Sequence, residues 1–169
     1  MKKMLLLVLT GFLYVVLAVP LKEVQASEIN TLPNGYYTVQ PKLNSNLQVD
    51  YKFKLANLTP GYGKFEFYYI PNKDAYVIND QFGFQSVKWA GSIGVGNLDW
   101  ENQNINDSSM LWTVEQVSDN QYIIHNKKDG NLVWDVHNYN PNLGTPIKLE
   151  NQHPANSPSR QAQIFVLNQ

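Results

Sequence analysis

The feature that most constrains the fold of this chain is a 14-residue segment that occurs twice, 85 residues apart. Residues 37–50 read YTVQPKLNSNLQVD and residues 122–135 read YIIHNKKDGNLVWD, and the two align without a gap. A weaker copy, PNKDAYVIN at residues 71–79, matches once two residues are dropped from its turn. Three copies of one strand–turn–strand unit indicate a fold built by internal triplication.

Short strands account for the rest of the chain after residue 26, where helical periodicity is absent. Alternating or aromatic runs are bounded by Gly, Pro, Asn or Asp, which is typical of an antiparallel β domain. Strands are therefore expected at residues 36–39, 47–55, 64–70, 75–78, 85–89, 111–117, 122–125, 132–136, 146–149 and 163–167.

Three units of this kind fit one compact architecture. The repeats are expected at residues 32–66, 67–117 and 118–169, and no single unit can bury its apolar face alone. A closed β structure with pseudo-threefold symmetry, the β-trefoil, uses three such units. The sequence therefore predicts an all-β chain with a single β-trefoil domain at residues 27–169.

The N-terminal 26 residues have the layout of a secretory signal peptide. Lys2 and Lys3 precede an apolar run over residues 4–19, and small residues near Ala26 suit cleavage before Ser27. We expect the mature chain to be secreted, without an integral membrane span. Retention of the apolar run as a membrane anchor stays open as the alternative, although the run is shorter than a spanning helix normally needs.

Composition narrows the compartment and the partners. Removing residues 1–26 takes away three lysines and one glutamate, which changes the net charge from −1 to about −3. The absence of a basic tract argues against nucleic-acid partners. An exported chain without cysteine has no disulfide framework, and this favours a Gram-positive bacterial source.

No constellation for catalysis or for a cofactor is recognisable. The glycines of residues 91–96 have the wrong order for a dinucleotide fingerprint, and the three histidines lack metal-ligand spacing. Asp99 and Glu101 are interpreted as surface acids rather than as paired glycosidase carboxylates. No nucleophile elbow is present. The chain is therefore expected to be non-enzymatic, with no catalytic residue, metal or cofactor.

The third repeat carries a recognisable pattern. Asp135 follows its second strand, Gly144-Thr145-Pro146 comes next, and Gln163-Ile164-Phe165 closes the unit. This pattern resembles the repeats of ricin-B-type lectins. In the second unit Met110-Leu111-Trp112 keeps the closing aromatic residue, and the first unit has no convincing closing motif.

A closer resemblance extends over nearly all of the mature chain. The segments 32–35 (LPNG), 79–84 (NDQFGF), 134–136 (WDV) and 163–167 (QIFVL) are similar to the family of the smallest haemagglutinin component of botulinum neurotoxin complexes. That resemblance implies a β-trefoil acting largely as a connector between a sugar-binding haemagglutinin and the rest of an assembly. The export signal of this chain departs from that pattern.

The resemblance also implies where a sugar would bind. Asp135 is the best candidate, because a loop carboxylate can accept hydrogen bonds from two vicinal hydroxyls; turn stabilisation is the alternative. The aromatic platform of the family falls on Glu150, which cannot stack, whereas Trp100 lies near the platform position of the second repeat. The candidate sugar-binding residues are Asp135, His137, Tyr139, Asn151 and Gln163 in repeat three, and Asn79 and Trp100 in repeat two.

Two functions follow from these expectations. The first is a secreted carbohydrate-binding module that recognises glycans or glycoproteins. The second is a protein-binding adaptor in a toxin-like or adhesion complex, with degenerate sugar sites and other haemagglutinin or toxin components as partners. Its candidate interface is an aromatic set, since aromatic residues are enriched in interface cores: Tyr62, Phe82, Phe84 and Trp89.

Overall fold

The computed structural model describes residues 32–169, so the expected signal peptide lies outside the described residues. Within 32–169 no helix is both long and apolar enough to cross a bilayer. The elements are β1 (Gly35–Pro41), β2 (Leu47–Val49), β3 (Leu55–Asn57), β4 (Lys64–Ile70), η1 (Pro71–Lys73), β5 (Ala75–Asp80), β6 (Ser86–Trp89), β7 (Leu98–Glu101), η2 (Ser108–Met110), β8 (Trp112–Ser118), β9 (Gln121–Asn126), β10 (Leu132–Val136), η3 (His137–Tyr139), β11 (Ile147–Asn151), η4 (Pro158–Gln163) and β12 (Phe165–Asn168). The η elements are short 3₁₀ helices.

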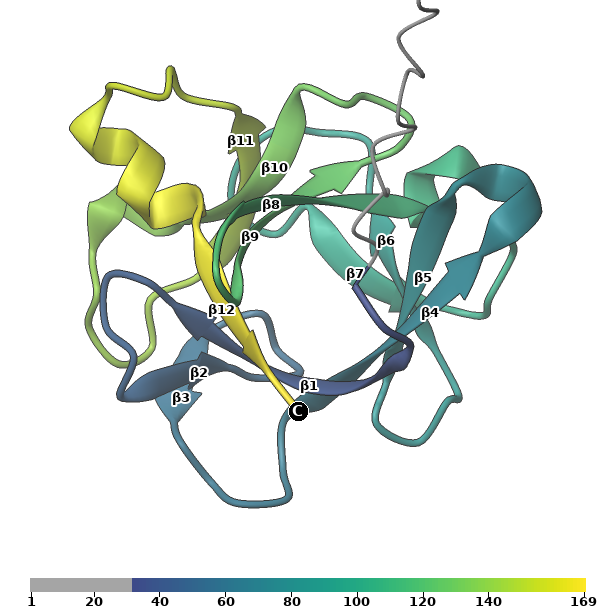
Figure 1. Cartoon of the computed structure of the whole chain (residues 1–169), viewed down its shortest axis with the longest axis horizontal. Helices are drawn as coiled ribbons and strands as arrows, with labels where there is room; N and C mark the ends of the chain where they lie inside the picture. Colours follow the sequence, from purple (N-terminus) through teal and green to yellow (C-terminus); the bar gives the residue numbers. More distant parts are fainter. Residues whose placement is uncertain (1–31) are drawn as a thin grey trace, which may run out of the picture.

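Six of the strands close into a ring (Figure 1). β1 pairs with β4 and β12, β5 pairs with β4 and β8, and β9 pairs with β8 and β12, all antiparallel. The other strands form three hairpins, β2–β3, β6–β7 and β10–β11. A six-stranded ring with three added hairpins is the β-trefoil, and the all-β prediction is confirmed.

Pseudo-threefold symmetry is visible in the pairing of aromatic residues. The first strand of each repeat places a tyrosine opposite a large aromatic residue of the last strand. The three pairs are Tyr37 with Phe65, Tyr76 with Trp112, and Tyr122 with Phe165. Phe65 is thus the closing aromatic residue of the first repeat, which the sequence did not reveal.

These pairs correct the alignment of the middle repeat. Residues 71–79 were expected to match the strand–turn–strand unit, but η1 and β5 occupy them. Counted from Tyr76 and Tyr122, Trp89 is the counterpart of Asp135, and Asn79 is the counterpart of His125. The two alignments compete because buried strands of similar apolar pattern precede both Asn79 and Asp135. The expected repeat boundary between residues 66 and 67 falls inside β4.

Two strand expectations also change. Residues 47–55, expected as one strand, contain β2, a turn and the start of β3. The turn forms because Oδ1 of Asp50 accepts hydrogen bonds from the backbone N–H groups of Lys52 and Lys54, each at 2.9 Å. The unexpected strand β7 pairs with β6 and completes the second hairpin.

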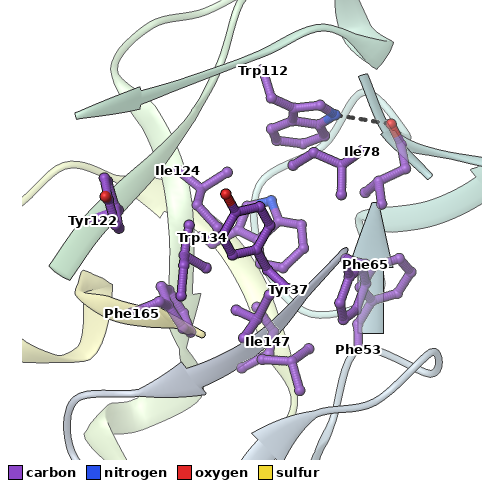
Figure 2. Close-up of a cluster of buried hydrophobic side chains, with 14 of the residues drawn as sticks. Tyr37, Phe53, Phe65, Ile78, Trp112, Tyr122, Ile124, Trp134, Ile147 and Phe165 are labelled. Atoms are coloured by element: carbon purple, nitrogen blue, oxygen red, sulfur yellow. Dashed lines mark hydrogen bonds between the residues drawn. The ribbon is translucent and has the colours of Figure 1, made fainter. Parts of the chain in front are cut away.

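Trp134 lies at the centre of the core (Figure 2). Its ring makes edge-to-face contacts with rings from every repeat, at centroid distances of 5.8–6.2 Å. These partners are Phe53, Phe65, Trp112 and Phe165. The buried core also includes strand residues from all three repeats: Leu47, Val49, Trp112, Leu132, Trp134 and Phe165.

The three hairpins are also bonded to one another. Backbone bonds join the first to the third, with Ile147 N donating to Phe53 O at 2.7 Å. The buried amide of Asn97 joins the second to the third, because its Oδ1 accepts from Leu149 N (2.9 Å) and its Nδ2 donates to Leu149 O (3.2 Å). Trp100 joins the second to the first, since its Nε1 donates to Tyr51 O at 2.6 Å.

Candidate functional site

Asp135 lies on β10 and is buried, with only 3% of its surface exposed. Lys148 on the facing strand β11 places Nζ 3.9 Å from its Oδ1, and His153 places Nε2 3.8 Å from its Oδ2. Lys148 also forms a 2.8 Å ion pair with Glu150. We call these four side chains the repeat-three cluster. The Asp135 carboxylate is covered by the neighbouring charged groups and does not stand at an open loop mouth.

The electrostatics of this cluster follow from burial. Desolvation raises the pKa of Asp135, because burial disfavours the charged form, and the nearby Lys148 ammonium opposes that effect. The hydrogen bond from Lys148 lowers the pKa of Glu150. Oδ2 of Asp135 is buried and has no hydrogen-bond partner among residues 32–169. The Lys148 ammonium lies between the Asp135 and Glu150 carboxylates, so it is already engaged and is not free to bind a sugar hydroxyl.

Gln163 is bonded to the backbone near this cluster, and Asn151 is bonded to another side chain. The fully buried side chain of Gln163 donates to Asn151 O at 2.9 Å and accepts from His153 N at 2.8 Å. The Asn151 side chain accepts a hydrogen bond from Nδ2 of Asn131 at 3.0 Å. Both ends of the Gln163 amide are thus engaged in tying strand β11 to the following loop.

His137 and Tyr139 lie on η3, directly after β10. Tyr139 has a left-handed backbone (φ 56°) and is 45% exposed. Nδ1 of His137 is buried and has no hydrogen-bond partner among the residues that the structure describes. Tyr139 is thus the solvent-facing aromatic residue of this loop.

Asn79 is held between the barrel and the second hairpin. It lies on the barrel strand β5, where its Nδ2 donates to Glu66 at 2.9 Å and its Oδ1 accepts from Ser86 at 2.7 Å. The alignment of residues 71–79 matches Asn79 to Asp135, but in the structure Trp89 is the counterpart of Asp135. Both polar ends of Asn79 have protein partners, and the side chain is buried.

Trp100 is the counterpart of Glu150 in the second repeat. Its pairing with Val87 in β6–β7 matches the pairing of Glu150 with Val133 in β10–β11. The indole stacks on Phe53 at 5.2 Å and on Phe65 at 5.8 Å. It is half-buried, so it belongs partly to the core and partly to the surface.

A pocket of about 360 Å³ opens beside Trp100, between the first and second repeats. The β3–β4 loop contributes Tyr62, the turn after β5 contributes Phe82, and the turn after β2 contributes Tyr51. We call this the aromatic pocket. Its full lining is Tyr51, Tyr62, Gly63, Lys64, Phe65, Asp80, Gln81, Phe82, Gln85 and Trp100.

Local backbone chemistry holds the walls of the aromatic pocket in place. Oδ1 of Asp80 accepts from the N–H groups of Phe82 and Phe84, each at 3.0 Å, which folds the turn that presents Phe82. On the opposite wall, Nε2 of Gln48 donates to Tyr62 O at 3.2 Å. Gly63, with a φ of +69°, leaves the space that this amide needs.

The aromatic pocket brings together residues from both sequence-based sets. Trp100 was a sugar-binding candidate, whereas Tyr62 and Phe82 were interface candidates. Tyr51 and Gln81 were missed, because the lining comes from three separate loops and leaves no contiguous motif.

The other two interface candidates lie apart from this lining. Phe84 is 77% exposed and stacks on Phe82 at 6.3 Å, outside the aromatic pocket. Trp89 lies under Lys128, whose Nζ is 5.4 Å from the ring centroid, and donates from Nε1 to Ser92 O at 2.7 Å. Of these two residues, Phe84 is therefore the one that extends the exposed aromatic surface beyond the pocket.

No protein-family model matches this sequence, and no curated protein sequence does either. Solved structures do share its fold. A mosquitocidal holotoxin superposes with a TM-score of 0.69 at 19% identity, over 83% of this chain and 18% of the toxin chain. A Macrolepiota procera ricin B-like lectin in complex with lactose gives 0.62 at 14% identity, over 82% of this chain and 97% of the lectin.

A GH43 β-1,3-galactosidase also matches, with a TM-score of 0.64 at 18% identity, over 82% of this chain and 28% of the enzyme. The chain therefore spans under a third of the holotoxin and of the galactosidase, and nearly all of the lectin. At these identities the likeness establishes the β-trefoil fold.

Proposed function

We propose that this chain is a non-enzymatic carbohydrate-binding module of the ricin-B-like type. The aromatic pocket carries the proposal: exposed rings stand beside amide and carboxylate groups, which is what a pyranose with one apolar face and several hydroxyls requires. Tyr62 and Phe82, 65% and 68% exposed, provide ring faces, and Gln85 provides a polar group. A ricin B-like lectin with the same fold, solved with lactose, supports the proposal.

The aromatic pocket is a better candidate than the repeat-three cluster. In the repeat-three cluster Glu150 stands where the family has its aromatic platform. Lys148 forms an ion pair with Glu150 at 2.8 Å, so the two charges neutralise each other. A sugar binding at Asp135 would have to break that ion pair and would gain no ring to stack on. We therefore assign recognition to the junction of the first and second repeats.

A glycan array probed with the full chain at high density tests this function. Tyr62→Ala and Phe82→Ala remove exposed rings and should abolish binding to any glycan retained by the wild type. Asp135→Ala should leave that binding intact. Tyr36→Ala is the matched control, because this tyrosine is 45% exposed on β1 and does not line the pocket. Loss with Asp135→Ala alone would move the site to repeat three.

A protein-binding adaptor is the second candidate, and one observation favours it. Phe82 and Phe84 stack on an exposed turn, where large apolar side chains are costly unless a partner covers them. Phe84 separates the two functions, since it lies outside the aromatic pocket. Phe84→Ala should keep glycan binding and lose a protein partner in a pull-down from the culture medium. An unchanged pull-down would exclude this turn as the interface.

Export belongs to the same proposal and rests on residues 1–26. A haemagglutinin-like partner, as in the botulinum-type complexes that the sequence resembles, is the expected assembly in the adaptor case. N-terminal sequencing of protein recovered from the medium should begin at Ser27. Recovery of the intact N-terminus in the membrane fraction would instead favour an anchored form.

A further inference from the structure

The aromatic pocket is mostly apolar, and this limits what can fill it. A pyranose offers one face of C–H groups to one ring, but here Tyr51, Tyr62, Phe82 and Trp100 all contribute to the walls. Burying unpaired hydroxyls among these rings would cost free energy. The matching ligand therefore carries an additional apolar group of its own.

Gln81 provides a second, polar requirement. This residue lines the aromatic pocket, and no group in the described part of the chain donates a hydrogen bond to its buried Oε1. A buried acceptor without a donor is costly, and the terminal amide torsion of glutamine is soft. The amide can therefore turn toward a ligand without breaking a protein bond. It then offers one acceptor and one donor side by side.

We propose that the aromatic pocket selects an N-acetylated amino sugar. The acetamido N–H donates to Oε1 of Gln81, its carbonyl accepts from Nε2, and its methyl group packs against the rings. Lys64 also lines the pocket, so a free amino sugar, which is a cation, is disfavoured. This inference rests on the proposed carbohydrate-binding function and adds the sugar class to it.

Titration calorimetry on the full chain tests this selectivity with five probes. They are N-acetylglucosamine, N-acetylgalactosamine, glucose, galactose and glucosamine. At least one N-acetylated sugar should bind about tenfold more tightly than its parent hexose, since an amide pair and a buried methyl group together exceed about 1.4 kcal/mol. Glucosamine should bind no better than glucose.

Two glutamine variants locate the effect. Gln81→Leu should remove the preference, so that the N-acetylated sugar and its parent hexose bind this variant with the same affinity. Gln121→Leu is the matched control, because Oε1 of Gln121 is also buried without a partner in the described structure. Gln121 lies on β9, outside the pocket lining. This control variant should change neither affinity.

The outcomes separate this inference from the function on which it rests. Equal affinity for acetylated and parent sugars, with binding still lost in Tyr62→Ala, overturns the inference and keeps the function. A preference that survives Gln81→Leu, or disappears in Gln121→Leu, also overturns it. If no probe binds and the glycan array is blank, both the function and the inference fail.

Discussion

Gly63 has a backbone φ of +69°, and a Cβ added there would lie 2.5 Å from Nε2 of Gln48. Gly61, two residues earlier, has a φ of +78° with nothing within 4 Å. Gly61→Ala therefore adds backbone strain alone, about 1 kcal/mol. Gly63→Ala adds strain and displaces a buried amide, so we expect a loss of about 2–3 kcal/mol in urea denaturation. Equal losses would show that the Gln48 contact is unimportant.

Asp135 gives a pH-dependent prediction at the same scale. Burial raises its pKa, so the folded chain binds this proton more tightly than the unfolded chain. Its contribution to the free energy of unfolding is complete below 3.8, the ordinary pKa, and is lost as pH rises through the raised pKa. Asp135→Asn cannot ionise, so its stability relative to the wild type should increase as pH rises above about 4 and should level off once Asp135 is ionised in the folded wild type. Parallel stability curves would contradict this.

Asn97 acts at the scale of the elements, because it joins the second and third hairpins. Asn97→Ala would leave Leu149 N–H without its side-chain partner and weaken the pairing of Leu149 O. We expect a loss of about 2–4 kcal/mol in the free energy of unfolding, from two buried backbone groups. Asn131→Ala, at an exposed turn, is a control with little expected loss. A similar small loss at Asn97 would mean that the hairpins are held by packing alone.

The sequence was informative about strands and less so about their assembly. Aromatic and β-branched runs predicted most strands, but β7 was missed because its four residues follow a glycine-rich loop. The middle repeat was misaligned because the sequence alignment matched Asn79 to Asp135, whereas the structural counterpart of Asp135 is Trp89. The register of barrel strands, which depends on partners far away in the chain, resolved the ambiguity.

The candidate site shows the same limit. Trp100, Tyr62 and Phe82 were each singled out from the sequence, for different reasons, yet nothing in their spacing places them in one pocket. The resemblance made Asp135 a candidate sugar ligand, but the sequence did not show that Lys148 and His153 lie beside its carboxylate. Composition and local pattern indicate which residues are candidates for a site, whereas the closure of the barrel determines which of them lie next to one another.

Valency is a property of the whole molecule. The position of Trp100 is occupied by Ala56 in the first repeat and by Glu150 in the third, by the register of the three hairpins. Threefold symmetry of the fold is thus not accompanied by three aromatic pockets. Calorimetry should give a stoichiometry of about one sugar per chain. The monomer should not agglutinate cells, whereas beads densely coated with it should; agglutination by the free monomer would show a second site.

The ring of strands also has a consequence for biosynthesis. β12, made after every other strand of the domain, pairs with both β1 and β9, so both keep an open edge until it is complete. Deleting residues 165–169 should abolish the cooperative thermal transition, whereas deleting Gln169 alone should preserve it; a cooperative transition in the longer deletion would contradict this. A nascent chain of this architecture cannot close its barrel until β12 has emerged from the ribosome, so the edges of β1 and β9 stay unpaired throughout the synthesis of the domain.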